Sequence, residues 1–522
     1  MGWPTAGTLT DMSRTPLVAR MTAGLAAAAM ALGVTQLAAA FFSPAADART
    51  AVGTSVINLT PGPIKEWAIQ TFGTNDKTFL TVMVVVVISA LIAAAAIWER
   101  ARIPLGTLAL AVAGVAGSLA VLDQPGGRVV DLIPTMLGTG CGIAALRLLT
   151  REPSSSAAAQ ADPEQPNPQR RRSLQTLGLI GFGALSGVGG NLLSRQRRSV
   201  AADRDAFALP KINSPAPPIP PGVQPAGVDL PSFITSNADF YRIDTSLSVP
   251  QIAREDWKLR IHGMVDREIT YTLADLAAFE VVERPVTLTC VSNPVGGNLI
   301  SNAMWTGYRV RDLLKAVGIQ PDADMVLSTS HDGFTAGTPV EALTDNREAL
   351  LAVGMNGVPL PVEHGYPARL VVPGLYGFVS ATKWVVDLEI TRFDRAEAYW
   401  TKLGWSAKAP IKTESRIDVP RSGARVAPGP VTVGGVAWAQ NRGIKAVEVR
   451  IDDGPWQPAT LGAAYSNDTW RLWTFPWQAT PGSHTVTARA TDNTGTVQTQ
   501  EQAPPPPDGA SGWPSISVEV KG

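Results

Sequence analysis

Long apolar stretches in the first 200 residues constrain the fold of this chain more than any other feature. Four approach the roughly 20 residues that a helix needs to cross a bilayer, and they span residues 21–42, 79–98, 105–122 and 129–149. A fifth, at 174–193, is rich in glycine and serine but carries no charge, so its insertion into lipid costs little. The sequence predicts an N-terminal all-α membrane domain, residues 1–200, with about five transmembrane helices.

Arginines flank these stretches and predict their orientation, because cytoplasmic loops are enriched in Lys and Arg. The arginines on the predicted cytoplasmic side are Arg14, Arg20, Arg100, Arg102, Arg147, Arg151 and the three at 170–172. With an odd number of spans, the rest of the chain lies outside the cytoplasm, although Arg195, Arg197 and Arg198 oppose this orientation. We expect a multi-pass protein of the cell (inner or plasma) membrane with extracytoplasmic later domains.

Arg171 and Arg172 precede the fifth, glycine-rich stretch, an order that is similar to a twin-arginine export signal placed inside the chain. Such export moves folded domains, which a cofactor inserted in the cytoplasm would require. A plain basic flank of a transmembrane helix explains the pair equally well, so both interpretations stay open.

Several partners are disfavoured by composition. The five stretches contain no histidine and the chain has no Cys-x-x-Cys-His motif, so we expect no haem in this chain. Basic and acidic residues balance at 44 each, which gives no indication of a nucleic-acid partner. The membrane part is therefore interpreted mainly as an anchor.

Two linkers separate the predicted domains. Residues 151–172 are rich in Pro, Ser and Gln and are expected to form a flexible cytoplasmic loop. Residues 201–231 are a proline-rich linker, and 209–231 is predicted to be an extended stalk that rises about 3.1 Å per residue.

Cys290 is the only cysteine in the second half of the chain and follows a predicted strand. Apolar and polar residues alternate over 280–289, and Pro294 with two glycines then breaks the strand. A thiol held at a strand end is suited to be a nucleophile or a ligand of a soft metal. A small buried hydrophobic residue is the alternative interpretation.

The region 232–405 shows strand and helix signals in alternation and is predicted to be an α+β domain with many loops. His364, Arg369 and Lys383 lie in loops beside short apolar strands. Together with loop amides, these residues can bind a phosphate or another anion.

Six motifs follow one another between residues 240 and 374: Phe240-Tyr241-Arg242, Thr287-Leu288-Thr289-Cys290-Val291-Ser292-Asn293, 305–314, Asp332-Gly333-Phe334, 355–361 and 364–374. In order and spacing, they resemble the molybdenum-cofactor domain of the sulfite oxidase family. The resemblance implies that Cys290 supplies the thiolate ligand of molybdenum. The residues that it implies hold the pterin and its phosphate are Phe240, Tyr241, Arg242, Ser292, Asn293, Asp332, His364, Arg369, Ser380, Thr382 and Lys383.

The resemblance further implies oxygen-atom transfer or a related two-electron reaction on a small molecule, with the metal and pterin supplying the redox chemistry. Because no haem is expected in the chain, a separate electron carrier is needed. His331 and Tyr308 are interpreted as candidates for proton transfer near the metal.

Two positions depart from the sulfite-oxidising members. Pro294 stands where they have an arginine after the asparagine, and Gly377-Phe378-Val379 stands where they have Gly-Ala-Arg. Two lost cations would each cost about 1.5–3 kcal/mol of binding to a doubly charged anion. The sequence therefore disfavours sulfite and favours a neutral or larger substrate at an opening lined by Tyr376, Phe378 and Pro294.

Residues 406–522 contain four or more short strands separated by turn residues, which predicts an all-β immunoglobulin-like sandwich. By the same resemblance this domain serves homodimerisation. Its tryptophans at 438, 456, 470, 473 and 477 are interpreted as core and interface residues, with a carbohydrate-binding face as the alternative.

Two other functions stay open at this point. Thr-Leu-Thr-Cys290 is similar to the cysteine motif of sortases, which would make the chain a cysteine transpeptidase with His262 near the thiol. The second is an anchored, non-catalytic binding or adhesion protein.

Overall fold

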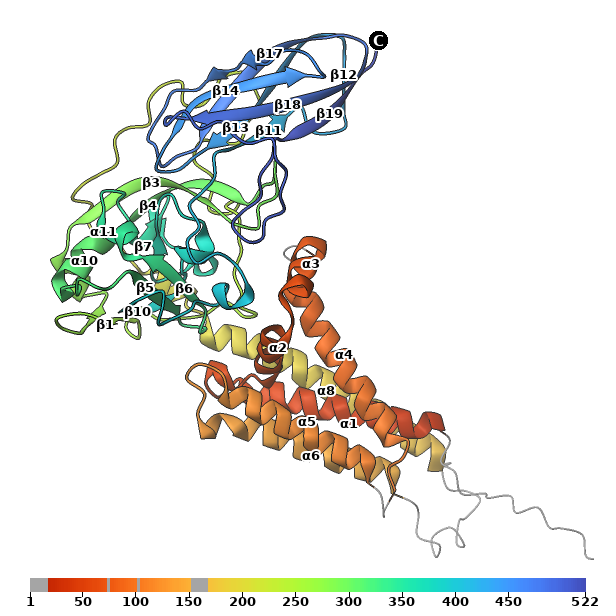
Figure 1. Cartoon of the computed structure of the whole chain (residues 1–522). Coiled ribbons are helices and arrows are strands. Elements are labelled where there is room, and N and C mark those ends of the chain that lie inside the picture. Colours follow the sequence, from red (N-terminus) through yellow and green to blue (C-terminus); the bar gives the residue numbers. More distant parts are fainter. Residues whose placement is uncertain (1–16, 73–75, 101–103, 152–167) are drawn as a thin grey trace, which may run out of the picture. The chain divides into compact units, whose positions relative to one another are not determined.

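The computed structural model describes residues 17–72, 76–100, 104–151 and 168–522. The chain divides into two compact units, Met1–Ser199 and Val200–Gly522, the first helical and the second rich in strands (Figure 1). Arg14, Arg102 and most of the predicted loop 151–172 lie outside the described residues.

The N-terminal unit is a helix bundle in which α1 packs against α4, α6 and α8. Its elements are α1 (Leu17–Ala39), η1 (Pro44–Ala46), α2 (Ala48–Leu59), α3 (Gly62–Phe72), α4 (Asp76–Ala96), α5 (Leu105–Leu122), η3 (Val129–Leu132), α6 (Ile133–Thr150) and α8 (Pro168–Arg198). A methyl group added at Gly33 of α1 would overlap the backbone of Gly183 in α8. The glycines therefore permit the close approach of these two helices.

Five helical segments in the described residues are long and apolar enough to cross a membrane, in agreement with the five predicted stretches. They are Leu17–Ala39, Lys77–Ala96, Leu105–Leu122, Val129–Thr150 and Arg170–Asp205. Large apolar side chains such as Leu119 and Leu185 are 63% and 74% exposed, whereas Ala27 is fully buried. Small residues inside and large ones outside are the arrangement expected in lipid.

Helices α2 and α3 were not predicted, because their polar residues interrupt the apolar pattern. Arg171 and Arg172 lie in the first turns of α8, where Arg172 donates to the carbonyl of Arg151 (2.7 Å). The export signal stays a prediction.

The middle domain in the second unit contains two β-sheets, which carry the loops that matter for the site. One has the strand order β2-β1-β10-β5-β6, with β1 (Lys258–Gly263), β2 (Ile269–Thr272), β5 (Met325–Ser330), β6 (Thr335–Pro339) and β10 (Val385–Thr391). The other has the order β3-β4-β7-β8, with β9 also paired to β7, and comprises β3 (Val281–Thr289), β4 (Ile300–Arg309), β7 (Leu350–Met355), β8 (Val358–Pro359) and β9 (Arg369–Val371).

Short helices connect these strands: α9 (Ala201–Asp205), η4 (Asp275–Ala278), α10 (Val310–Val317), α11 (Val340–Thr344), η5 (Val362–His364), η6 (Gly377–Val379) and η7 (Thr401–Leu403). In α10 the apolar residues Val310, Leu313 and Val317 are buried, as its periodicity predicts. Gly318 ends it with a φ of 71°, a conformation that favours glycine.

The C-terminal domain is a sandwich of two sheets, as predicted. One sheet has the order β11-β13-β17-β16 and the other β12-β19-β18-β14-β15. The strands are β11 (Glu414–Val419), β12 (Ala424–Val426), β13 (Gly429–Trp438), β14 (Ile444–Ile451), β15 (Gln457–Pro458), β16 (Thr460–Leu461), β17 (Arg471–Ala479), β18 (Gly482–Asp492) and β19 (Ser515–Val520). Four of the five tryptophans, 438, 470, 473 and 477, are buried, which confirms core packing for them.

The two domains of the second unit share an apolar core. Val436 and Trp438 of β13 and Leu472 of β17 belong to the same buried cluster as residues of the middle domain. One face of the β11–β13–β17 sheet therefore packs on the middle domain, and its opposite face packs inside the sandwich.

The proline-rich segment 209–231 is not a free stalk, so this prediction was wrong. Asn213 donates its backbone N–H to Val281 (2.9 Å), and Ser214 forms a β-bridge with Val282. Val223 is 2% exposed, and the Gly222 carbonyl accepts from Ala463 of the sandwich (2.9 Å). Prolines are compatible with an extended segment that packs on a protein surface, here called a strap, as well as with a solvated stalk. Composition alone cannot distinguish the two.

Candidate active site

Cys290 directly follows β3, where the predicted strand ends. It is 9% exposed, and its backbone N–H donates to Leu299 (2.9 Å) across the base of a ten-residue loop. Asn293 closes the same loop, because its Oδ1 accepts from the N–H of Leu299 (2.8 Å). The thiol is therefore held by a rigid strand and a cross-braced loop.

The C-terminal domain fixes this strand from the other side. Gln440 donates from Nε2 to the carbonyl of Thr287 and to Oγ1 of Thr289, both at 3.0 Å. Trp470 donates its backbone N–H to Oγ1 of Thr287 (2.8 Å). The position of Cys290 thus depends on both domains.

A cationic pocket lies on the middle-domain side, built from Arg242, Asp244, His364, Arg369 and Lys383. Lys383 Nζ lies 2.8 Å from Asp244 Oδ2, and Arg242 Nε bonds to the same oxygen at 3.1 Å. Arg369 donates to the carbonyls of His364 (3.2 Å) and Ala381 (3.4 Å). Among the described residues, no carboxylate lies within 4 Å of its guanidinium. These side chains carry two more positive than negative charges.

Burial raises the free energy of the charged side chains in this pocket and thereby shifts their pKa values. It lowers the pKa of Arg369 to about 10 and that of Lys383 to about 8, although Asp244 opposes the shift of Lys383. Burial, with the charges of Arg369, Lys383 and Arg242, lowers the pKa of His364 to about 3. His364 is therefore neutral at physiological pH, and the pocket is electrostatically suited to bind an anion.

Aromatic side chains join the cationic pocket to the cysteine. Phe240 stacks on Tyr241 (ring centroids 5.4 Å apart) and meets His364 edge-on at 5.5 Å. The guanidinium of Arg369 lies 5.1 Å from the Trp305 ring centre. Burial raises the pKa of Tyr241, Cys290 raises it further and Arg369 lowers it. Tyr241 therefore lies within electrostatic range of both predicted ends of the site.

Ser380 and Thr382 are fully buried, but their hydroxyls form internal hydrogen bonds. Ser380 Oγ donates to the carbonyl of Tyr376 (2.9 Å), and Thr382 Oγ1 lies 2.7 Å from Ser328 Oγ. Their contribution to a ligand site is thus through the backbone or through the shape of the loop. Ser292 is half-buried in the cysteine loop.

His331 and Asp332 lie in an exposed turn after β5. The His331 N–H donates to the carbonyl of Trp384 (2.9 Å), the residue after Lys383, and Asp332 Oδ1 accepts from Phe334 (3.3 Å). The hydrogen bond to Trp384 places this turn beside the loop that carries Lys383.

Tyr308 is not near Cys290. Tyr308 pairs with Val281 at the start of β3, whereas Thr289, next to Cys290, pairs with Ile300. Eight residues of strand separate the two positions, or roughly 26 Å at 3.3 Å per residue. Its interpretation as a proton donor at the metal was therefore wrong, because strand register was not known from the sequence.

The residues that depart from the sulfite-oxidising pattern flank the cysteine loop. Pro294 is exposed, and Gly377 at the start of η6 would place a methyl group 3.9 Å from the Thr289 carbonyl. Phe378 in the same turn packs on Trp405, with ring centroids 5.6 Å apart. The segment beside the cysteine loop therefore carries an aromatic residue where the sulfite-oxidising pattern has a cation.

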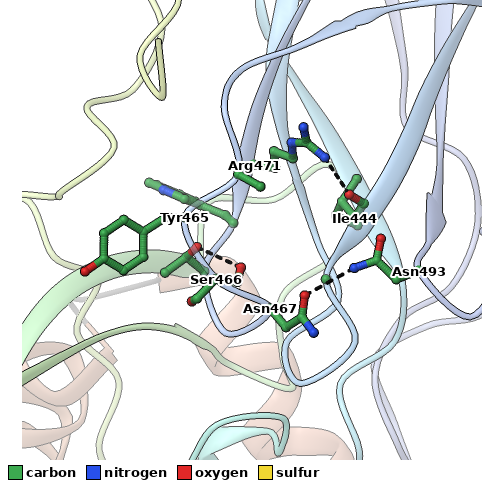
Figure 2. A pocket seen from close by; sticks show the side chains of 10 residues that line it. Ile444, Tyr465, Ser466, Asn467, Arg471 and Asn493 are labelled. Carbon is green, nitrogen blue, oxygen red and sulfur yellow. Dashed lines mark hydrogen bonds between the residues drawn. The ribbon is translucent and has the colours of Figure 1, made fainter. Parts of the chain in front are cut away.

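A pocket of about 100 Å³ in the C-terminal domain is a weaker candidate (Figure 2). Its polar groups bond to one another: Arg471 donates to the Ile444 carbonyl (2.9 Å), and Asn493 Nδ2 donates to Asn467 Oδ1 (3.2 Å). The internal pairing gives no indication of a ligand.

Sequence reasoning missed Asp244, Asn237 and Gln440. Asp244 joins Arg242 and Lys383, the carbonyl of Asn237 lies 3.3 Å from His364 Nε2, and Gln440 clamps the cysteine strand. Asp244 stands two positions after Arg242, which was a usable signal. The other two act through contacts between distant segments and left no local signal.

Comparisons with known proteins agree with this geometry. A family described as "Oxidoreductase molybdopterin binding domain" matches residues 246–400, and one described as "Bacterial Ig domain" matches residues 414–498. The crystal structure of the sulfane dehydrogenase SoxCD from Paracoccus pantotrophus shares the fold, with a TM-score of 0.50 at 23% identity over 56% of this chain and 85% of that chain.

Three relatives cover different shares of the sequence. Sulfite oxidase of Gallus gallus is 28% identical over 379 residues, which cover 60% of this chain and 81% of that protein. Mitochondrial sulfite oxidase of Homo sapiens is 29% identical over 52% of this chain, which spans only 58% of the human protein. The uncharacterized oxidoreductase YuiH of Bacillus subtilis (strain 168) is 31% identical over 28% of this chain and 72% of its own length.

Fold, site and comparisons together define a molybdopterin-dependent oxidoreductase. The chain belongs to the sulfite oxidase family of these enzymes. This assignment overturns the sortase-like and non-catalytic interpretations. His262 lies in β1, where its Nε2 is 2.9 Å from Asp387 Oδ1.

The residues present fit the cofactor that this family implies. A phosphorylated pterin would supply the negative charge that Arg369 lacks among the described residues, and it would balance the positive charge that Asp244 leaves over on Arg242 and Lys383. Asn293 Nδ2 is buried with no hydrogen-bond partner among the described residues, so a donor is available beside Cys290.

Proposed function

We propose that this chain is a membrane-anchored enzyme that performs oxygen-atom transfer, or a related two-electron reaction, at the extracytoplasmic face. The observation that carries the proposal is the buried excess of positive charge in the cationic pocket, which Tyr241 links to Cys290 because it lies within electrostatic range of both Arg369 and the thiol. A charge without a partner in a protein interior requires a counter-ion. The molybdopterin phosphate is the counter-ion that this family supplies.

In this proposal Cys290 is the protein ligand of molybdenum, and the chain's own residues bind and orient the cofactor. Arg242, Arg369 and Lys383 hold the phosphate, while neutral His364 serves as a hydrogen-bonding group. Phe240, Tyr241, Ser292, Asn293 and Asp332 complete the pocket, and Ser380 and Thr382 shape its loop. The cofactor supplies the redox chemistry.

A neutral substrate is favoured over sulfite. The half-buried Phe378 packs on the buried Trp405, in the turn that Gly377 opens beside the end of the cysteine strand. Arg416 of β11 donates to the Gly297 carbonyl (3.2 Å) but pairs with Asp418 (2.8 Å), so this cation is neutralised. An opening with little net charge gives a dianion no advantage.

Membrane anchoring rests on the five apolar helical segments, and the extracytoplasmic face rests on their flanking arginines. Electrons pass to or from a separate carrier. A homodimer through the sandwich domain completes the proposal.

The test of the cofactor is molybdenum and pterin analysis of the full-length chain, purified from a host that makes the cofactor. We expect about one molybdenum per chain in the wild type and in Cys141→Ser, the matched control in α6, because only Cys290 is a ligand. Cys290→Ser should lose metal or change its electron paramagnetic resonance signal. Folded wild-type protein without molybdenum and pterin would contradict the proposal.

The substrate proposal is tested by Pro294→Arg, which restores a cation at an exposed position, with Pro294→Gln as the control. We expect sulfite turnover to be very low in the wild type and to rise about 10-fold or more only in the arginine variant. Efficient sulfite turnover by the wild type would refute the proposal of a neutral substrate.

Orientation is tested by adding one cysteine, Lys521→Cys or Arg151→Cys, to a Cys141→Ser background, and Cys141→Ser alone measures the labelling of the buried native Cys290. In intact cells, a membrane-impermeant maleimide should label the cysteine at 521 and spare the one at 151. Labelling of the cysteine at 151 and not of the one at 521 would contradict the proposed topology and indicate the opposite orientation.

A further inference from the structure

A buried carboxyl group lies on the sandwich side of the cysteine strand, outside the cationic pocket. Glu414 opens β11 and is 4% exposed, and its Oε1 has no hydrogen-bond partner among the described residues. It also lines a cavity of about 400 Å³ with Lys412, Arg442 and Gln498. Burial raises the pKa of Glu414 to about 8, against the opposing charge of Lys412.

Two further buried atoms without partners lie at the end of β13 and in the turn that follows it. Trp438 pairs directly opposite Glu414 in the β11–β13 register, so the two side chains share a face. Trp438 Nε1 has no hydrogen-bond partner among the described residues, and neither does Oε1 of Gln440, two positions further on. Buried polar groups of this kind are commonly satisfied by internal water.

This row of polar groups reaches the cysteine strand. Gln440 bonds through its Nε2 to Thr289, the neighbour of Cys290. Tyr376 provides a second connection. Burial raises the pKa of its phenol well above the ordinary value, and the charges of Glu414, Asp508 and Cys290 raise it further, while a hydrogen bond from the Lys412 backbone lowers it. The phenol is therefore within electrostatic range of both Glu414 and Cys290.

The charged groups around Glu414 are already paired. Lys412 bonds to Asp508 (2.9 Å) and to the Gly509 carbonyl (2.6 Å). Arg442 pairs with Asp492 at 2.8 Å, and on the same strand Arg416 pairs with Asp418 at 2.8 Å. Among the described residues, no ion pair joins a cation to Glu414, so its carboxyl group can exchange a proton.

We propose that Glu414 and Tyr376 are the proton-exchanging groups of a proton route between the 400 Å³ cavity and the active site at Cys290, in which Trp438 and Gln440 hydrogen-bond the internal water that completes the route. The inference rests on the proposed function. Oxidation of a substrate S by water gives SO, two protons and two electrons. The electrons leave to the separate electron carrier, and the route gives the protons a path to solvent. In the reductive direction both flows reverse.

The first test needs no cofactor. Infrared spectra of the full-length chain in detergent are recorded between pH 6 and 10 for the wild type, Glu414→Gln, Glu414→Asp and the exposed control Glu501→Gln. We expect the carbonyl stretch of a protonated carboxylic acid to titrate near pH 8 in the wild type and the control, and to be missing in Glu414→Gln. Absence of such a band from folded wild-type protein overturns the inference.

The second test uses cofactor-loaded protein. The midpoint potential of the molybdenum(V) resonance signal is measured against pH. In the wild type and in Glu501→Gln, we expect the slope of the midpoint potential against pH to change near pH 8. In Glu414→Asp this change should occur at a different pH, and in Glu414→Gln it should be missing. Tyr376→Phe should show a weaker pH dependence of the midpoint potential. Identical curves for the wild type and Glu414→Gln exclude a proton route through Glu414. If no variant binds molybdenum, the proposed function fails with the inference, and the infrared titration still shows whether Glu414 is protonatable.

Discussion

Two buried charge clusters in the second unit are built in opposite ways. The carboxylate of Asp492 in the sandwich is fully buried and accepts from Arg442 Nε (2.8 Å), Thr413 Oγ1 (2.7 Å) and Thr494 Oγ1 (2.6 Å). Arg369 in the middle domain lies against the ring of Trp305, and the hydrogen bonds that it donates to described residues all go to backbone carbonyls.

The pKa values show what this difference means. Burial alone raises the pKa of Asp492, but the hydrogen bonds from Thr494, Arg442 and Thr413 lower it overall. Burial lowers the pKa of Arg369 to about 10 with little to oppose it. A buried charge that the fold stabilises serves structure, whereas one left without a counter-ion indicates a ligand.

The largest expected effect comes from breaking the satisfied cluster. Arg442→Met leaves Asp492 buried without its cation, and breaking such a pair costs about 3–5 kcal/mol of unfolding free energy. Tryptophan fluorescence during denaturation of the full chain measures it. The control is Arg425→Met in the exposed pair with Glu519, where we expect a loss below about 1 kcal/mol. Equal losses would remove the distinction between the clusters.

The unsatisfied cluster should respond in ligand binding rather than in folding. Arg369→Met removes a charged hydrogen-bond donor, so cofactor retention should fall about 10- to 150-fold. The loss of unfolding free energy should be smaller than for Arg442→Met. Molybdenum content and denaturation of the same samples measure both quantities, with Arg260→Met in β1 as the exposed control. A variant that retains molybdenum at the wild-type level would show that Arg369 is structural.

Sequence patterns predicted most of the fold because burial leaves a periodic signal. An apolar face, or an apolar surface all round the element, marks the five apolar stretches, the strand before Cys290 and the sandwich strands. Helices α2 and α3 lack such a pattern, and the strap 209–231 packs through backbone bonds that composition does not encode.

Site residues that belong to contiguous motifs were predicted from the sequence. Site residues that reach the site only through tertiary contacts were missed. His364, Arg369 and Lys383 were found by their loops, but their neutralising partner Asp244 was not. The prediction that Tyr308 transfers protons near the metal was wrong because the register of β3 and β4 places Tyr308 at the far end of the sheet. Gln440 comes from a different domain, and only the packed structure brings it to the cysteine strand. Glu414 comes from the same domain, and only the packed structure brings it within electrostatic range of Tyr376.

The cationic pocket should also show a pH dependence of its own. Lys383 has a folded pKa of about 8, below the usual value of about 10.4. The unfolded chain therefore binds more protons between these values, and the cofactor-free protein gains stability as pH rises through this window. Lys383→Met should lack this gain in thermal melts between pH 7 and 10. Phosphate binding should weaken above pH 8 by up to about tenfold per pH unit in the wild type.

The smallest expected effect tests a satisfied pair at the surface. A hydrogen bond from His484 to Asp452 (2.8 Å) raises the pKa of His484, and its bond to the Thr480 backbone raises it further. Because the folded pKa is raised, this stabilisation is complete below the unfolded pKa of about 6.5 and is lost as pH rises through the folded pKa. His484→Gln should lower the melting temperature by about 1–2 °C at pH 5.5 and leave it unchanged at pH 9. An equal decrease at both pH values would mean that packing on Trp477, 5.3 Å away, and not charge, stabilises this surface pair.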